Sequence, residues 1–135
     1  MLYGEEHVRR YQATDGAEGY DWRKGTTILL LTTTGRRSGE VRTSPLIFRP
    51  YGEDYLVVAS KGGSDQPPGW YLNLQSNPTV RVQIKGDKFI AHARTASPAE
   101  KPDMWRAMTE VWPDYDQYQK RTKREIPVIV LERAA

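Results

Sequence analysis

The chain has 135 residues, of which 38% are hydrophobic, and this size predicts a single domain with a modest core. Cysteine is absent, which excludes disulfides, thiolate catalysis and zinc–sulfur sites. The formal net charge of +3 permits an anionic ligand, nucleic acid or an anionic lipid surface, and it selects none of them.

The first 25 residues are polar and weakly patterned, with enough helix-forming residues over 5–12 for one or two turns. We expect residues 1–25 to form a helix-and-loop segment packed on the body, and residues 26–135 to form one domain. The longest apolar run, 28–31, is far too short to cross a bilayer. The N-terminus also lacks the blocks of a secretion signal, so we expect a cytoplasmic location.

Strands are the commonest elements that the pattern predicts. The run at 28–31 is continuously apolar, which indicates a strand buried on both faces. The other runs alternate or are rich in β-branched residues. The predicted strands cover residues 26–33, 41–49, 55–60, 80–84, 88–95 and 127–132.

Helices are predicted between some of these strands. A short helix at 70–74 should end before Asn77-Pro78. A longer one should start at Ser97, whose spacing from Glu100 is that of a capping box, and run to about residue 111. Pro113 should separate it from a last short helix. Hairpin connections and irregularly placed helices favour a small antiparallel barrel with helices at its side over a doubly wound parallel sheet.

The segment 32–45 holds most of the chemistry that can be inferred from residue types. Gly35 and Gly39 permit positive φ and close backbone approach, so several N–H groups can point at one spot. Arg36, Arg37 and Arg42 add fixed positive charge with forked donors. Such a turn suits a phosphate or carboxylate, although a solvated basic hairpin would have the same composition.

A second group of candidate site residues combines a glycine-rich segment at 60–63 with hydroxylated aromatics. Tyr115 and Tyr118 are three residues apart and should face the same side of a helix, where they could donate to a developing oxyanion. The pair Trp70-Tyr71 could wall a flat cofactor. The tyrosines could equally well pack a short helix onto the barrel, and for Trp70-Tyr71 the pattern alone slightly favours that structural role.

Motifs for several other chemistries are missing. No G-x-G-x-x-G follows a strand, and no Walker loop, H-E-x-x-H or nucleophile elbow is present. His7 and His92 are far apart in sequence and lack nearby partners. We therefore expect neither a metal site nor acyl transfer.

Several motifs in one order resemble the deazaflavin-dependent nitroreductase family over residues 7–132. They are Leu29-Leu30-Leu31-Thr32-Thr33-Thr34-Gly35-Arg36-Arg37-Ser38-Gly39, Arg42-x-x-Pro45-Leu46, Ala59-Ser60-Lys61-Gly62-Gly63, Trp70-Tyr71-Leu72-Asn73-Leu74, Asn77-Pro78, Trp112-Pro113-Asp114-Tyr115-x-x-Tyr118 and Ile126-Pro127-Val128. The resemblance implies an α+β, mainly β fold: a split β-barrel related to FMN-binding and pyridoxamine-phosphate-oxidase-like proteins, with flanking helices.

The resemblance also implies a cofactor and a reaction. The cofactor is coenzyme F420, an 8-hydroxy-5-deazaflavin with a phosphate and an oligoglutamate tail. In its reduced form it gives a hydride to a quinone, a nitroaromatic or an activated alkene. The cofactor supplies this chemistry, and the protein supplies placement and charge.

The site residues that the resemblance implies fall into three groups. Cofactor binding falls on Gly35, Arg36, Arg37, Ser38, Gly39, Arg42, Ser44, Pro45, Ala59, Ser60, Lys61, Trp70, Tyr71 and Asn73. The proton-donating residue is Tyr115, and the acceptor side falls on Ile47, Gly69, Trp112, Tyr115 and Tyr118. Relatives can carry tyrosine where this chain has Ile47 and Trp112, and methionine where it has Gly69, so these three positions bear on acceptor choice.

Two alternatives remain beside this interpretation: an FMN-dependent oxidoreductase on the same barrel, and a carrier that binds the coenzyme without turning it over. Nucleic-acid binding is not expected, since few aromatics near 35–42 could stack on bases. A small-molecule acceptor is the expected partner, with peripheral membrane contact if that acceptor is a quinone. The chain is expected to be a monomer or homodimer.

Overall fold

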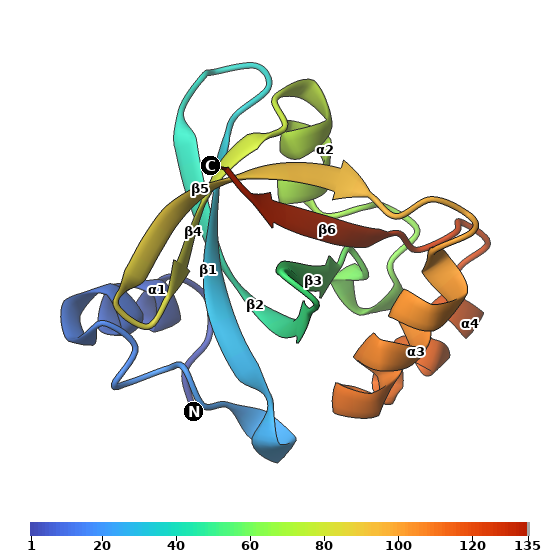
Figure 1. Cartoon of the computed structure of the whole chain (residues 1–135), viewed down its shortest axis with the longest axis horizontal. Helices are drawn as coiled ribbons and strands as arrows, with labels where there is room; N and C mark the ends of the chain where they lie inside the picture. Colours follow the sequence, from blue (N-terminus) through green and yellow to red (C-terminus); the bar gives the residue numbers. More distant parts are fainter. Residues whose placement is uncertain (135) are drawn as a thin grey trace.

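In a computed structural model, which describes residues 1–134, an antiparallel barrel of six strands is surrounded by helices (Figure 1). Around the barrel the strand order is β1-β2-β3-β6-β5-β4, and β4 closes the ring onto β1. Along the chain the elements are α1 Gly4–Thr14, η1 Arg23–Gly25, β1 Thr27–Thr34, β2 Val41–Tyr51, β3 Asp54–Val58, η2 Lys61–Gly63, α2 Gly69–Ser76, β4 Thr79–Ile84, β5 Asp87–Thr95, α3 Lys101–Val111, α4 Asp114–Lys120 and β6 Val128–Arg133. The predicted mainly β fold with flanking helices is confirmed.

The centre of β1 is buried on both faces, as its continuous apolar run predicts. Leu29 and Leu31 point into the barrel, where they pack with Phe48. Ile28 and Leu30 point outward and are covered by Tyr11 of α1. In Figure 1, α1 lies on the side of the barrel opposite to α3 and α4, so helices cover the outside of the barrel on two sides.

The second strand extends further than its sequence pattern indicates. It ends at Tyr51 rather than at residue 49, because the tight turn falls at Gly52, which has a φ of 61°. Pro50, expected in the turn, lies within the strand opposite Tyr55. The hairpin is therefore tighter than predicted.

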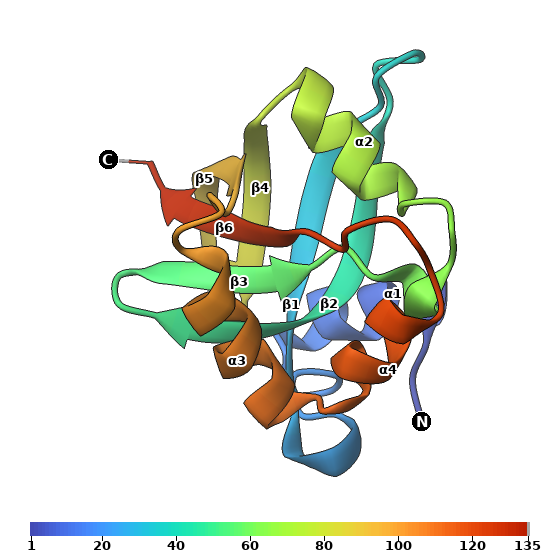
Figure 2. The same ribbon diagram turned by 90° about the vertical axis from the view of Figure 1, so that its right-hand side faces the viewer.

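Most of β2 has a neighbour on one side only. Residues 41–48 pair with β1, whereas β3 pairs only with residues 49–51. Pro45 lies in the unshared stretch, where a missing N–H is tolerated because no second strand needs it. This leaves a free strand edge on the side of the barrel where α2 and α4 lie (Figure 2).

The third helix begins at Lys101, four residues after the predicted start at Ser97, although its capping box forms. The Glu100 amide donates to Ser97 Oγ at 3.3 Å, and the Ser97 amide donates to Glu100 Oε1 at 2.9 Å. Residues 98–100 form a turn ahead of the helix. Arg94 donates to both carboxylate oxygens of Glu100, which fixes the start of the helix on β5. Within residues 1–134, no helix has the length and hydropathy needed to cross a membrane.

Tyr11 attaches the N-terminal helix to the barrel through a buried hydroxyl. This hydroxyl donates to the Ile28 carbonyl at 2.9 Å and accepts from the Lys85 amide at 2.8 Å. The Tyr11 side chain is fully buried. One phenol oxygen therefore links α1, β1 and the β4–β5 turn.

Replacing Tyr11 by phenylalanine is expected to lower the free energy of unfolding by about 1–3 kcal/mol, because two backbone groups lose their partner. Tyr3→Phe is the control, since Tyr3 is more than half exposed. Urea denaturation followed by circular dichroism measures both. Equal losses in the two variants would contradict this role of Tyr11.

Candidate active site

Two cavities lie along the free edge of β2, and Trp70 lines both of them. One has a volume of about 440 Å³ and carries the arginines of the β1–β2 turn, so we call it the basic cavity. The other has a volume of about 400 Å³ and is lined mainly by rings, so we call it the aromatic cavity. Both sizes fall in the range of small-molecule sites.

The basic cavity is built from the β1–β2 turn, the start of β2 and one face of α2. Its lining residues are Gly35, Arg36, Arg37, Ser38, Arg42, Ser44, Gly69, Trp70 and Asn73. In Figure 1 the turn projects from the end of the barrel next to α2. The segment that the sequence singles out as anion-binding therefore lies over a hollow rather than away from the body.

The two glycines of this turn are needed for different reasons. Gly39 has a φ of 74°, a left-handed conformation that favours glycine. Gly35 has no such φ, but a Cβ there would lie 2.9 Å from Ser38 Oγ and 3.0 Å from the Glu40 carbonyl oxygen. The expected close approach of the backbone thus occurs at Gly35, and the positive φ occurs at Gly39.

Most amides of the turn are used within the protein, which differs from the expected convergence on an anion. The Gly35 amide donates to the Glu40 carbonyl at 2.7 Å, and the Gly39 amide donates to the Gly35 carbonyl at 3.0 Å. The Glu40 amide donates to Ser38 Oγ at 3.1 Å. Positive side chains, rather than a nest of amides, therefore dominate the basic cavity.

Arg36 and Asn73 fix the turn to α2. The Arg36 guanidinium and the Arg36 amide both donate to Asn73 Oδ1, at 3.0 and 3.2 Å. Asn73 in turn donates to Thr33 Oγ1 at 3.2 Å. Asn73 is buried, so its amide serves as a bridge between β1, the turn and the helix.

Arg37 and Arg42 remain available to a ligand. Both side chains are exposed, and within residues 1–134 neither guanidinium pairs with a carboxylate or donates a hydrogen bond to a protein acceptor. Two guanidinium groups beside a cavity with no counter-ion form a favourable place for a phosphate or carboxylate.

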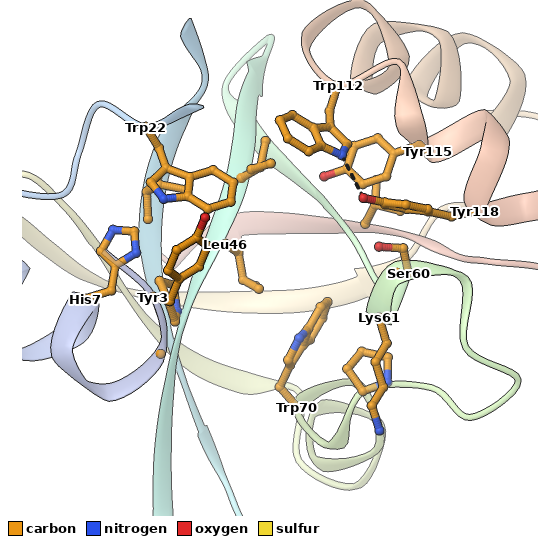
Figure 3. A pocket seen from close by; sticks show the side chains of 17 residues that line it. Tyr3, His7, Trp22, Leu46, Ser60, Lys61, Trp70, Trp112, Tyr115 and Tyr118 are labelled. Atoms are coloured by element: carbon orange, nitrogen blue, oxygen red, sulfur yellow. Dashed lines mark hydrogen bonds between the residues drawn. The ribbon is translucent and has the colours of Figure 1, made fainter. Parts of the chain in front are cut away.

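The aromatic cavity is enclosed on three sides (Figure 3). Trp112, Tyr115 and Tyr118 come from the α3–α4 region, Ser60, Lys61 and Trp70 from the segments after β3, and Tyr3, His7 and Trp22 from the N-terminal region. The remaining lining residues are Gly4, Ile28, Pro45, Leu46, Ile47, Val58, Gly62 and Pro68. Residues distant in sequence thus meet at one pocket.

The two tyrosines of α4 lie together, as their spacing predicts. Their rings are 6.1 Å apart in an edge-to-face arrangement. Trp112 Nε1 donates to the Tyr118 hydroxyl at 3.2 Å, which leaves the proton of that hydroxyl free to donate elsewhere. Tyr115 is only 5% exposed, and burial raises the pKa of its phenol. It therefore stays protonated, as a hydrogen-bond donor, at neutral pH.

The N-terminal region supplies a wall of the cavity that sequence analysis missed. Trp22 packs on Trp112 with ring centroids 5.9 Å apart and on Tyr3 at 5.7 Å. Its indole N–H donates to the Leu2 carbonyl at 3.0 Å. His7 is buried beside it and is hydrogen-bonded to the Gly19 carbonyl at 2.8 Å. Ring content around Tyr3 and Trp22 was the available signal, but spacing alone could not link it to residues near 112.

The predicted site residues divide between the cavities, with a few outside both. Pro45, Ile47, Ser60, Lys61, Trp112, Tyr115 and Tyr118 line the aromatic cavity, and Trp70 lines both. Gly69, expected on the acceptor side, lines the basic cavity instead. Gly39, Ala59 and Tyr71 line neither. Ala59 is fully buried, and the Tyr71 hydroxyl accepts a hydrogen bond from Gln75 of the same helix.

Solved structures with the same architecture define the class of protein. A structure described as an F420-H2 dependent reductase (FDR-A) is 40% identical, with a TM-score of 0.72, over 78% of this chain and 93% of that one. Another, described as a domain-swapped dimer, is 38% identical, with a TM-score of 0.75, over 93% of this chain and 96% of that one. The chain is thus a split β-barrel of the kind found in deazaflavin-dependent reductases.

The sequence comparisons give the family itself. The profile of the F420H(2)-dependent quinone reductase family matches residues 3–133. An F420H(2)-dependent quinone reductase of Mycobacterium tuberculosis (strain ATCC 25618 / H37Rv) is 39% identical over 131 residues, which cover 94% of this chain and 87% of the relative. This chain belongs to the F420H(2)-dependent quinone reductase family, and the resemblance inferred from its motifs is confirmed.

Arg37→Ala and Arg42→Ala are each expected to raise the dissociation constant of coenzyme F420 about ten- to a hundredfold, because a charged hydrogen bond contributes roughly 1.5–3 kcal/mol. Arg106→Ala is the control, since Arg106 is exposed on α3 and its one ion pair among residues 1–134 is with Asp103 of the same helix. Quenching of the coenzyme's fluorescence measures all three. An unchanged constant in both turn variants would refute the assignment of the basic cavity to the coenzyme.

Proposed function

We propose that this chain transfers a hydride from reduced coenzyme F420 to a quinone, and that the coenzyme lies along the free edge of β2. The observation that carries the proposal is the arrangement of the two cavities. One end is cationic and the other is apolar and aromatic, and Trp70 belongs to both. A molecule with an anionic tail and a flat tricyclic ring needs this combination.

The residues present fit the coenzyme on chemical grounds. Arg37 and Arg42, which have no carboxylate partner within residues 1–134, would hold the phosphate and glutamate groups. Ser60, Lys61 and Trp70 would contact the ring region, where Trp70 offers a flat apolar face and the other two offer polar atoms. The bound coenzyme supplies a hydride donor, and the protein has to hold the acceptor close to it.

The acceptor would occupy the part of the aromatic cavity between α4 and the N-terminal wall. Conversion of a quinone to a quinol adds one hydride and one proton, and negative charge develops on a quinone oxygen during this step. Tyr115 and Tyr118 both line the cavity, and their hydroxyl protons could stabilise that charge. Because burial raises the pKa of Tyr115, we assign it as a hydrogen-bond donor, with solvent as the final source of the proton.

Trp22 and Trp112 would set the length of the acceptor that fits. Their indoles are in contact with each other, so they close the cavity rather than sandwich a ligand between them. Lys24 Nζ lies over the Trp112 ring, 5.2 Å from its centre, in a cation–π contact. Nitroaromatics and enones of similar size would meet the same walls, so the quinone preference rests on the family rather than on a polar contact.

The expected membrane contact and the expected dimer remain proposals. Tyr3 lines the aromatic cavity and is 56% exposed, and the neighbouring Met1 is 76% exposed. This apolar rim would favour delivery of a lipid-soluble quinone from a membrane surface. A second copy of the chain is supported only by the domain-swapped dimer formed by one similar structure.

Titration with coenzyme F420 and, separately, with FMN tests the cofactor assignment. We expect saturable quenching by coenzyme F420 at micromolar concentration, and oxidation of its reduced form when menadione is added. Absence of binding would refute the proposal. Tight binding of FMN instead would favour an FMN-dependent enzyme, and binding without oxidation by quinones, nitroaromatics or enones would favour a carrier.

Tyr115→Phe is expected to lower turnover by about a hundredfold, the cost of removing one oxyanion donor, and to leave the coenzyme's dissociation constant nearly unchanged. Tyr51→Phe is the control, because Tyr51 lies at the far end of β2 and lines neither cavity. Since burial raises the pKa of Tyr115, ionisation of this phenol should cause no loss of wild-type turnover as the pH rises to about 10, the ordinary pKa of tyrosine. A loss of coenzyme affinity in Tyr115→Phe would place Tyr115 against the coenzyme instead.

A further inference from the structure

The segment that forms the floor of the aromatic cavity has a backbone conformation that needs external support. After β3 the chain passes through Lys61, Gly62 and Gly63, which have φ values of 46°, 63° and 86°. Lys61 is not a glycine, so its left-handed conformation is unfavourable unless neighbouring contacts hold it. This segment carries Ser60 and Lys61, the polar groups of the cavity floor.

Arg124 provides most of these contacts. Its Nε donates to the Ser64 carbonyl at 2.8 Å, and its Nη2 donates to the Ser60 carbonyl at 2.8 Å. Nη1 and Nη2 both donate to the Ala59 carbonyl at 3.2 Å. One guanidinium therefore holds three carbonyls on both sides of the left-handed residues, with the strength of charge-assisted hydrogen bonds.

Arg124 is itself held by helix α4, the helix that carries the tyrosines. Gln119 Nε2 donates to the Arg124 carbonyl at 2.8 Å, and Gln119 Oε1 accepts from the Ile126 amide at 2.9 Å. Gln119 directly follows Tyr118 in the sequence. Hydrogen bonds from Gln119 thus fix the backbone around Arg124 to α4, the helix that carries the tyrosine wall of the aromatic cavity.

The loop and the helix also touch directly. A Cβ at Gly63 would lie 2.7 Å from the Tyr118 carbonyl oxygen, so only glycine permits this approach. Arg121 donates to the Gly62 carbonyl at 3.3 Å, and Thr122 donates to Asp65 Oδ1 at 2.7 Å. Residues 59–65 and 114–124 therefore behave as one unit, with Arg124 at its centre.

We propose that Arg124 is a positioning residue that fixes the floor carrying Ser60 and Lys61 relative to the wall carrying Tyr115 and Tyr118. This inference rests on the proposed function, in which the floor meets the coenzyme and the wall meets the acceptor. Under this proposal, the distance between the coenzyme and the acceptor depends on the Arg124 side chain, which lines neither cavity. A misplacement of about 1 Å in such a site can cost a hundredfold in rate.

Lysine could not replace Arg124 in this role. The three carbonyls are reached by three different nitrogens of a planar fork, whereas an ammonium group is a single point. Ala59 is fully buried, so its carbonyl would be left without a donor if the guanidinium were removed. Arg124→Lys should therefore recover only part of what Arg124→Ala loses.

The control is another arginine that holds backbone elsewhere. Arg49 Nη1 donates to the Ala107 carbonyl at 2.7 Å and pairs with Glu110, which fixes α3 to β2 away from both cavities. Arg49→Ala thus removes a comparable structural contact. All variants are compared well below the melting temperature of the least stable one.

Amide hydrogen exchange of the ligand-free protein is the first readout. Arg124→Ala is expected to raise exchange at least about tenfold in peptides covering both 59–66 and 114–120, because the lost contacts release both segments. Arg49→Ala should leave these peptides at wild-type rates. Unchanged exchange in either peptide of Arg124→Ala, or an equal rise in Arg49→Ala, would overturn the proposal.

Steady-state kinetics with reduced coenzyme F420 and menadione is the second readout. In Arg124→Ala, kcat is expected to fall about ten- to a hundredfold, with Arg124→Lys in between. The coenzyme's dissociation constant should change by a smaller factor than kcat, because Arg37 and Arg42, which hold the tail, are untouched. A kcat of Arg124→Ala equal to that of the wild type would overturn the positioning role.

A wild type without any turnover would contradict the proposed function alone, since hydrogen exchange still decides the role of Arg124 in joining the two segments.

Discussion

The whole site depends on the unequal pairing of β2. This strand continues well beyond the point where β3 leaves it, so residues 41–48 are bonded to β1 only. The barrel core is still closed by the other strand pairs. The unshared edge of β2 therefore forms a rigid groove while the barrel core stays closed. Pro45 is tolerated on this edge because no neighbouring strand requires its missing N–H.

Two polar bridges hold the irregular segments at the ends of this groove. Asn73 ties the β1–β2 turn to α2 through Arg36, and Arg124 ties the segment after β3 to α4. Both bridges use side chains with several polar atoms to satisfy backbone groups of strained loops. Arg37 and Arg42 are left without such partners in the part of the chain described here, which distinguishes them from the structural arginines Arg36 and Arg124 and is the basis for proposing that they bind the coenzyme.

The sequence predicted the strands and the basic turn well, because these depend on local pattern. Alternation and apolar runs placed the barrel strands to within a few residues, and glycine and arginine content marked the turn. The sequence could not predict contacts between residues that lie far apart in the chain. Spacing could not show that Trp22 packs on Trp112 or that Gly69 lines the cavity of the arginines. It also could not show that the Arg36 guanidinium donates to Asn73 instead of remaining available to a ligand. Arg124 lies in a charged stretch whose composition is typical of exposed surface. Its three carbonyl partners become apparent only in the folded structure.

The central claim is that the arginines of the β1–β2 turn bind the anionic tail of a deazaflavin whose ring lies beside Trp70. The most direct measurement compares the dissociation constants of coenzyme F420 and of its deazaflavin chromophore without phosphate and glutamates, at low and high salt. The account predicts that the tailless compound binds at least about tenfold more weakly and that only the complete coenzyme loses affinity as salt rises. Equal affinities and equal salt dependence for the two compounds would contradict it.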